Sequence, residues 1–424
     1  MGTSAAIVVQ GGGNNLRFDP GNSAIIRDNS SVGLQVAPGQ TLALVDGDLA
    51  LQGANLTAEG GRIELWAVAN GLVGISNNND KLAITREQAT QFGDIRFTSA
   101  ASVDASGNGG GAIQVQGRRI SLLDGAAILA ATLGTGDGGD ITVGASEAVE
   151  VLGFDQNLLF PSVISTSSQA GSSGKTGDIA LETPRLVVGD GGRIATATFG
   201  SGNAANISIK ANSVEAFGTI GNSSASGLFT FAAVGATGNA GDLNIETQRL
   251  RLTDGARVLT VTIGAGNGGN LSIKATEAVE VIGFAKFINP TVPTPFIVGS
   301  AIASSVSRPG VTGNAGNLTI ETGRLTVQDG GQIVTSTFGV GKGGNLTVRA
   351  TEAVELIGTS GTNPPAISSL SALAGSNSTG NARNLTIETP ELNAVRLRHF
   401  SPLPQLLTKA PVSHKRRGEQ ENLL

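Results

Sequence analysis

The amino-acid sequence predicts an all-β protein whose strands stack in a parallel solenoid. Composition is the first observation: glycine is 62 of 424 residues, charged residues are 14% and aromatic residues 4%, yet 39% of the chain is hydrophobic. A disordered linker would not carry so many apolar residues, and the abundant glycine supplies turns. The other two observations are a set of long internal repeats and the spacing of apolar side chains inside them.

Two segments recur along the chain. GGNLSIKATEAVEVIGF (268–284) returns as GGNLTVRATEAVELIGT (343–359) and has an earlier form, GGDITVGASEAVEVLGF (138–154). GDLNIETQRLRLTDGARVLTVTIG begins at residue 241 and also recurs. Its copies are separated by 66, 64, 75 and 67 residues, counted from Ala112 through Asp178, Asp242, Asn317 and Asn384. The chain therefore holds four full units and the start of a fifth.

Apolar side chains alternate inside each unit, as at Ile179 and Leu181. This two-residue period is typical of strands, and β-branched residues and glycines disfavour helix. Strands of about five residues with short turns make a coil of roughly 20–25 residues, so we expect about three coils per unit. The repeat region should then form about 17 coils in a rod roughly 80 Å long.

Stacking explains why the repeats interchange only Ile, Leu and Val. Each residue in a solenoid lies on its counterpart in the next coil, and a charge in an inward column would be buried unpaired. We expect Ile273 and Ile320 to point inward. An Asp or Asn stands at the start of many copies, directly after glycine in all but one, where its side chain can bond nearby backbone in a turn: Asp140, Asp178, Asn206 (after Ala205), Asp242, Asn270, Asn317 and Asn345.

Two stretches carry a resemblance to a known family. GQTLALVDGDLALQGANLTAEGGRIELWAVANG (39–71) resembles the end of the haemagglutination-activity domain of filamentous haemagglutinin-like exoproteins, and the Gly-Asn-Leu-Thr-Ile-Glu-Thr units resemble the repeats that follow it. The resemblance covers nearly all of residues 20–392. It implies a right-handed parallel β-helix (a single-stranded, pectin-lyase-like solenoid), export through an outer-membrane TpsB-type transporter, and an extracellular or cell-surface location.

This resemblance divides the chain into three parts. We expect residues 1–72 to be the C-terminal remnant of the haemagglutination and secretion domain, residues 73–392 the repeat region, and residues 393–424 an irregular basic tail. The start, MGTSAAIVVQGGG, lacks the basic and apolar regions of a signal peptide, and the family's Asn-Pro-Asn-Gly-Ile signature is missing. We therefore expect a chain truncated at both ends, whose first 20 residues cover the solenoid poorly, so that it associates end to end or frays from its N-terminus.

Several functional classes are disfavoured by composition. The sequence contains no run of about 18 apolar residues, so it predicts no transmembrane helix. The net charge of −5 and the lack of a basic patch argue against nucleic-acid binding. Cysteine is absent and both histidines, His399 and His414, lie in the tail, so we expect no disulfide, no histidine triad and no cofactor. The stretch 134–143 partly matches a calcium-binding nonapeptide, but one imperfect copy builds no calcium column.

The sequence favours a non-enzymatic adhesin that binds a cell-surface glycan or protein receptor. The alternatives are a polysaccharide lyase or hydrolase on the same fold, and a non-functional remnant. Hydrolysis needs two carboxylates about 5–9.5 Å apart in one groove. Asp46 and Asp48 are the best non-repeating pair. The other acids recur in every unit, which indicates an architectural role: Asp124, Asp190, Asp254 and Asp329 in Asp-Gly turns, and Glu182, Glu246, Glu321 and Glu388 after the first strand.

The stretches that vary between units form the candidate binding surface. They are residues 155–176, 219–240, 285–315 and 360–383, and they fall at the same place in each unit. Insertions of this kind project from one face of a solenoid and often bind ligands. Phe160, Phe287 and Phe296 are the candidate contact residues. The competing interpretation is that these stretches only cover the side of the solenoid.

Overall fold

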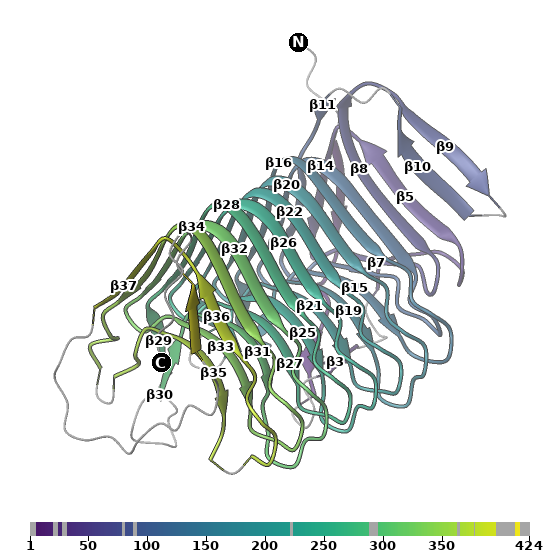
Figure 1. The fold of residues 1–424 in the computed structure, drawn as a ribbon. Coiled ribbons are helices and arrows are strands. Elements are labelled where there is room, and N and C mark those ends of the chain that lie inside the picture. Colours follow the sequence, from purple (N-terminus) through teal and green to yellow (C-terminus); the bar gives the residue numbers. More distant parts are fainter. Residues whose placement is uncertain are drawn as a thin grey trace.

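The chain folds as a parallel β-helix in the computed structural model, which describes residues 6–19, 24–27, 32–78, 81–87, 91–220, 224–287, 296–362, 365–376, 378–395 and 412–415 (Figure 1). These residues form strands, turns and loops, and none of them is helical. The predicted all-β solenoid is confirmed.

The larger of two main sheets has 17 strands and contains the longest strands of the molecule. Eight of them are 11 or 12 residues long and pair in parallel from coil to coil: β14 (Ala112–Leu123), β16 (Ile141–Leu152), β20 (Ile179–Gly189), β22 (Ile207–Phe217), β26 (Leu243–Thr253), β28 (Leu271–Ile282), β32 (Leu318–Gln328) and β34 (Leu346–Ile357). Shorter strands extend the sheet at both ends: β1 (Ala6–Gln10), β5 (Thr41–Asp46), β6 (Asp48–Gln52), β8 (Arg62–Asn70), β11 (Gln91–Phe92), β12 (Ile95–Thr98), β36 (Leu385–Glu388), β37 (Glu391–Val395) and β38 (Val412–Lys415).

The second main sheet has 11 strands, one from each coil, and they are mostly six residues long. In chain order they are β4 (Leu34–Gln35), β7 (Asn55–Thr57), β13 (Ser102–Asp104), β15 (Ala127–Thr132), β19 (Val163–Ser168), β21 (Arg193–Thr198), β25 (Gly227–Ala232), β27 (Arg257–Thr262), β31 (Ala301–Val306), β33 (Gln332–Thr337) and β35 (Ser369–Ala374). We call the two outer surfaces the long-strand face and the short-strand face.

Each long strand covers two sides of the coil because it bends at a corner. In β20 the buried residues Ile179 and Leu181 are followed by the adjacent exposed pair Pro184 and Arg185, after which Leu186 is buried again. Two exposed residues in succession shift the alternation by one position, so both halves of the strand point apolar side chains inward.

The coils are larger than predicted. Ile179 lies opposite Ile207, 28 residues on, and Ile207 lies opposite Leu243, 36 residues on. A 64-residue unit is therefore two coils, one short and one long, and the prediction of three was wrong. The unbroken long strand and a glycine-rich connection of eight or more residues lengthen each coil. The 11-stranded sheet gives 11 coils and a rod of about 48 Å, in place of the predicted 17 coils and 80 Å.

One continuous apolar core fills the solenoid, from Leu42 to Ile387. Ile273 and Ile320 are fully buried in it, as predicted. Their columns continue through Ile245 and Val348 on the neighbouring coils, which accounts for the tolerated Ile and Val exchange. A side cluster of Trp66, Ile84 and Phe92 packs beside the hairpin of β9 (Val73–Asn78) and β10 (Lys81–Arg86).

The N-terminal segment lies along the side of the solenoid, and its fraying stays a prediction. β1 pairs in parallel with β6, and the segment then passes onto the short-strand face, where β2 (Arg17–Phe18) and β3 (Ile25–Ile26) form a small hairpin (Figure 1). Leu16 and Ile25 pack against Phe160, and Ala24 packs against Phe199. The described part of residues 6–27 thus covers the side of several coils and does not serve only as a cap on the first one.

Two short strands lie at the C-terminal end of the described residues, and the irregular tail at 393–424 stays a prediction. β37 pairs in parallel with the second half of β34, and β38 pairs in parallel with β36. His414 lies in β38 opposite Ile387. His399 lies outside the described residues.

Candidate binding surface

A small antiparallel structure projects from each long coil at the end of its long strand. Three are hairpins and the fourth is a single antiparallel bridge between Thr359 and Ile367. The hairpins are β17 (Phe154–Asp155) with β18 (Phe160–Pro161), β23 (Thr219–Ile220) with β24 (Ser224–Ala225), and β29 (Phe284–Phe287) with β30 (Phe296–Gly299). The four fall within or directly beside the predicted variable stretches. The strand-like pieces of those stretches, such as β19 and β31, belong instead to the short-strand sheet.

The base of each projection is held by the same two features. A glycine with positive φ begins each one (Gly153, Gly218, Gly283 and Gly358, φ 70–76°), where a side chain would be strained. A buried serine ends each one. The Oγ of Ser226 accepts a hydrogen bond from the Gly191 N–H (2.8 Å) and donates one to the Gly218 carbonyl (2.9 Å). Ser162, Ser300 and Ser368 accept the same bond from a turn glycine in their own coils, and each donates to the carbonyl of the residue just before the positive-φ glycine (Leu152, Ile282 and Ile357).

Each serine fastens its projection to an Asp-Gly turn of the preceding short coil. The four recurring aspartates of these turns have φ of 50–55° and the following glycines 79–100°, the combination of a type I′ turn. The turn is closed by a backbone bond, as from the Gly192 N–H to the Gly189 carbonyl (2.8 Å). These aspartates therefore occupy the architectural positions expected for Asp124, Asp190, Asp254 and Asp329.

The three candidate phenylalanines lie in two of the hairpins. Phe160 is only 1% exposed, and its ring contacts the ring of Phe18 with centroids 5.2 Å apart. The N-terminal segment packs over Phe160, so a ligand would reach this ring only after displacing that segment. Phe287 and Phe296 lie opposite each other at the described ends of β29 and β30, and their side chains lie outside the described part of the structure. A binding role for these hairpins stays a prediction.

Charges of opposite sign alternate along the first half of the long-strand face. Successive coils place Glu182, Lys210, Glu246, Lys274, Glu321, Arg349 and Glu388 in one column. Arg349 pairs with the glutamates on both sides of it, Glu321 at 3.4 Å and Glu388 at 3.2 Å. The alternation of charge is not visible when whole units are aligned. A unit is two coils, and the cation lies in the coil between two glutamates.

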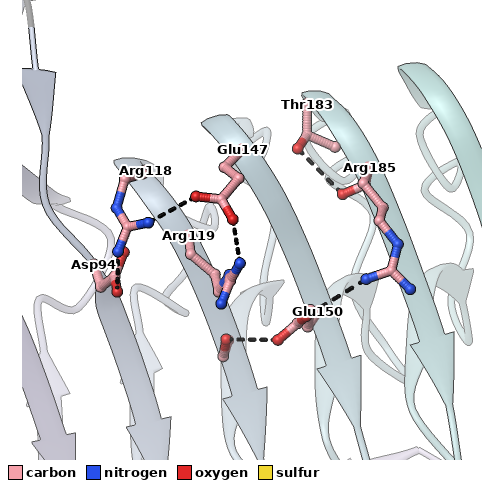
Figure 2. Close-up of polar contacts among 8 residues, drawn as sticks. Asp94, Arg118, Arg119, Glu147, Glu150, Thr183 and Arg185 are labelled. Carbon is pink, nitrogen blue, oxygen red and sulfur yellow. Dashed lines mark hydrogen bonds and ion pairs between the residues drawn. The ribbon is translucent and has the colours of Figure 1, made fainter.

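A second set of ion pairs follows the corner of the long strands (Figure 2). Arg118 contacts Asp94 at 2.8 Å and Glu147 at 2.7 Å, and Arg119 also contacts Glu147. Desolvation alone would raise the pKa of Glu147, but the hydrogen bonds and charges of Arg118 and Arg119 outweigh it and hold that pKa below its usual value. Further along the corner, Arg185 lies between Glu150 and Glu215.

The Asp and Asn residues that directly precede successive strands of the long-strand face form a hydrogen-bonded ladder along the rod. The Oδ1 of each accepts a bond from the backbone N–H of its counterpart in the next coil. Asn270 accepts from Asn317 at 3.0 Å, and the series runs without interruption from Asp140 to Asn384. The side chains therefore join neighbouring coils, where bonds within the turn were predicted.

The geometry offers little for catalysis. Asp46 Oδ1 accepts from the Gly47 N–H and Asp48 Oδ1 accepts from the Asp94 N–H, both at 2.7 Å, so each carboxylate has a structural partner. Asp137 and Asp140 of the calcium-like stretch likewise accept backbone bonds from the next coil. Within the described ranges, no group of three or more His, Asp or Glu side chains is arranged to hold a metal ion. The same part of the chain contains no helix that could span a membrane.

Comparison with known proteins gives one match. Residues 2–115 match the family model of the TPS secretion domain, which confirms the predicted resemblance to two-partner-secretion exoproteins such as the filamentous haemagglutinin-like proteins. The matched range extends past residue 72, includes the hairpin β9–β10 and ends four residues into β14. Such a domain implies secretion with the help of a TpsB-type transporter. No curated protein and no solved structure was found to match the chain.

Proposed function

We propose that this two-partner-secretion exoprotein is a non-enzymatic adhesin that works at the cell surface and binds a glycan or protein receptor with the side of its solenoid. One observation supports the proposal: the projections repeat at the same place on successive long coils. Each begins at a positive-φ glycine and is held by a buried serine at the equivalent position. A regular row of anchored projections with different sequences suits attachment through a surface, because the scaffold is constant while the contact residues vary.

The polysaccharide-processing alternative is less well supported. The recurring glutamates are separated by cations of the intervening coils, and Asp46 and Asp48 bond to backbone. A glycosidase acid needs a raised pKa and a nucleophile nearby, whereas the shift found at Glu147 is downward. A rod whose acids serve its own stacking fits adhesion better than hydrolysis.

The chain itself offers the replacement that tests this function. In the short coils an Asp-Gly turn closes the place where the long coils carry a hairpin. Replacing residues 284–299 with an Asp-Gly turn should remove one projection and leave the coil intact. A matched control shortens the described hairpin β9–β10, which lies outside the row.

Beads coated with the purified chain should adhere to cultured cells or polysaccharide-coated glass more than uncoated beads. The replacement should reduce adhesion several-fold with an unchanged β-sheet circular dichroism spectrum, and the control should not. Equal adhesion by coated and uncoated beads would refute the proposal. Release of new reducing ends or unsaturated products from a polysaccharide would establish the enzymatic alternative.

A further inference from the structure

A depression of about 390 Å³ lies on the short-strand face, where the N-terminal hairpin and β23–β24 flank strands β19 to β27. The floor of the depression forms where small side chains of one coil lie beside large side chains of the next. Ala195 and Ala197 of β21 lie opposite Phe229 and Phe231 of β25, so small residues on one coil adjoin large rings on the next. This difference in size leaves an apolar hollow beside the aromatic rings.

Two arginines point into this depression. Arg193 and Arg257 belong to one outward column and are separated by Gly227 of the coil between them, which puts their backbones about 9.6 Å apart. The guanidinium of Arg193 is held between two rings, 5.7 Å from the centroid of Phe18 and 5.5 Å from that of Phe229. Contact with the two rings restrains the group, and its N–H groups can still donate hydrogen bonds.

Neither arginine has an anionic partner in the described residues. The Nε of each is buried and makes no hydrogen bond, and the side chains that line the depression include no Asp or Glu. Burial lowers the pKa of Arg193 to about 10 and also lowers the pKa of Arg257. Arginine stays protonated at neutral pH in proteins, so both side chains count as cations. Two partly buried cations with unused donors are unfavourable without an anion, because a buried charged donor is stabilised by a charge-assisted bond.

We propose that this depression binds a carboxylate-bearing sugar, of the uronic or sialic acid type. A guanidinium edge matches a carboxylate in two parallel hydrogen bonds, the phenylalanine rings offer flat apolar faces to a sugar ring, and Ser165 and Ser224 add hydroxyls at the margin. The volume suits one or two sugar units. This inference rests on the proposed adhesive function, for which it names the ligand class.

A sugar fits the site better than an acidic peptide. Peptides bind β-proteins most readily by adding a strand to a free sheet edge. Strands β19 to β27 are paired on both sides within the solenoid, so their backbone groups are already used. What remains for a ligand is side-chain chemistry: two cations, ring faces and hydroxyls.

Isothermal titration calorimetry on the full chain tests the site. The probes are digalacturonate and 3′-sialyllactose, with methyl-esterified digalacturonate and lactose as neutral counterparts and pentaglutamate as the acidic peptide. We expect at least one carboxylated sugar to bind with a clear preference over its neutral counterpart. Which of the two binds more tightly distinguishes a uronate site from a sialate site.

Three variants probe the depression, and one serves as a control. Arg193→Gln and Arg257→Gln should each raise the Kd about tenfold or more, since each removes a charge-assisted bond. Ala195→Leu fills the floor without changing charge and should abolish binding even if Arg193→Gln impairs folding. Arg185→Gln, an ion-paired arginine on the long-strand face, should leave the Kd within about twofold of wild type, since it removes no bond to the ligand.

Equal binding of the neutral sugars, equal binding of pentaglutamate, or an equal loss with Arg185→Gln would overturn the proposal. So would a dimer that the depression variants dissociate, because a second copy would then fill the site. Bead adhesion separates the two proposals. Adhesion by a chain that binds no carboxylated sugar would refute the site alone, and sugar binding without adhesion would refute the adhesive function alone.

Discussion

The two faces of the solenoid use arginine in opposite ways. On the long-strand face, Arg185, Arg249 and Arg324 each contact a glutamate of a neighbouring coil. On the short-strand face, neither Arg193 nor Arg257 has a carboxylate partner among the described residues, and both line a depression that also contains phenylalanine rings. The same residue type neutralises repulsion between stacked coils on one side and is held as an unpaired cation on the other.

Recurrence separates these two roles. The long-strand arginines stand at equivalent positions in three units, as residues required by stacking should. In the short coils, the first residue of the short strand is in turn Ala127, Arg193, Arg257 and Gln332. A cation therefore occupies this position in only two of these four coils. A side chain that a solenoid does not need in every unit, and that lacks a partner where it occurs, is a better functional candidate than a recurring one.

The largest effect should come from the core on which both faces rest. Ile320 is fully buried, whereas its neighbour Thr319 points to the long-strand face. Ile320→Asp should lower the free energy of unfolding by about 4 kcal/mol or more, because it buries an unpaired charge. Thr319→Asp should cost far less, and the denaturant midpoints of both variants measure the difference. Similar midpoints would mean that the inward and outward columns have been assigned wrongly.

A smaller loss of stability should follow when the hydrogen bonds that hold one projection are removed. Ser226→Ala removes two buried hydrogen bonds, to Gly191 and Gly218, at a cost of about 1–3 kcal/mol. The Gly191 amide should then exchange its hydrogen faster, while amides of the long-strand face keep their rates. Ser208→Ala, at an exposed position on β22, is the matched control and should change neither stability nor exchange. An unchanged Gly191 rate in Ser226→Ala would show that the serine does not hold the projection.

The sequence predicted the fold class and the inward columns because these depend on local periodicity. Ile179, Leu181, Ile273 and Ile320 follow a two-residue period that is visible without any structure. The number of coils was wrong because nothing local indicates that one long strand bends around a corner. The depression was missed for a related reason: Phe18 and Phe229 are distant in the sequence, and only the folded N-terminal segment brings the first ring beside Arg193. The recurring serines were visible in the sequence, as the residue before the short strand of each long coil, but their partners were not.

The smallest effect concerns the corner ion pairs of the long-strand face. The pKa of Glu147 is lowered in the folded chain by Arg118 and Arg119, from a usual value of 4.5. A carboxyl with a depressed folded pKa contributes stability that is present above its unfolded pKa and is lost as pH falls through its folded pKa. The melting temperature of Glu147→Gln should therefore lie slightly below that of wild type at pH 7, by less than the decrease caused by Ser226→Ala. This difference in melting temperature, the gap, should close below pH 4.5.

Salt provides an independent check on the same pair. Glu147 is exposed, so 1 M sodium chloride should also narrow the gap at pH 7 by screening its attraction to the two arginines. Arg193→Gln, which removes no ion pair, should show no corresponding change in melting temperature with acid between pH 7 and pH 4. A Glu147→Gln gap that persists at pH 3 and in high salt would mean that the side chain stabilises the corner by packing, and the electrostatic contrast between the two faces would fail on this side.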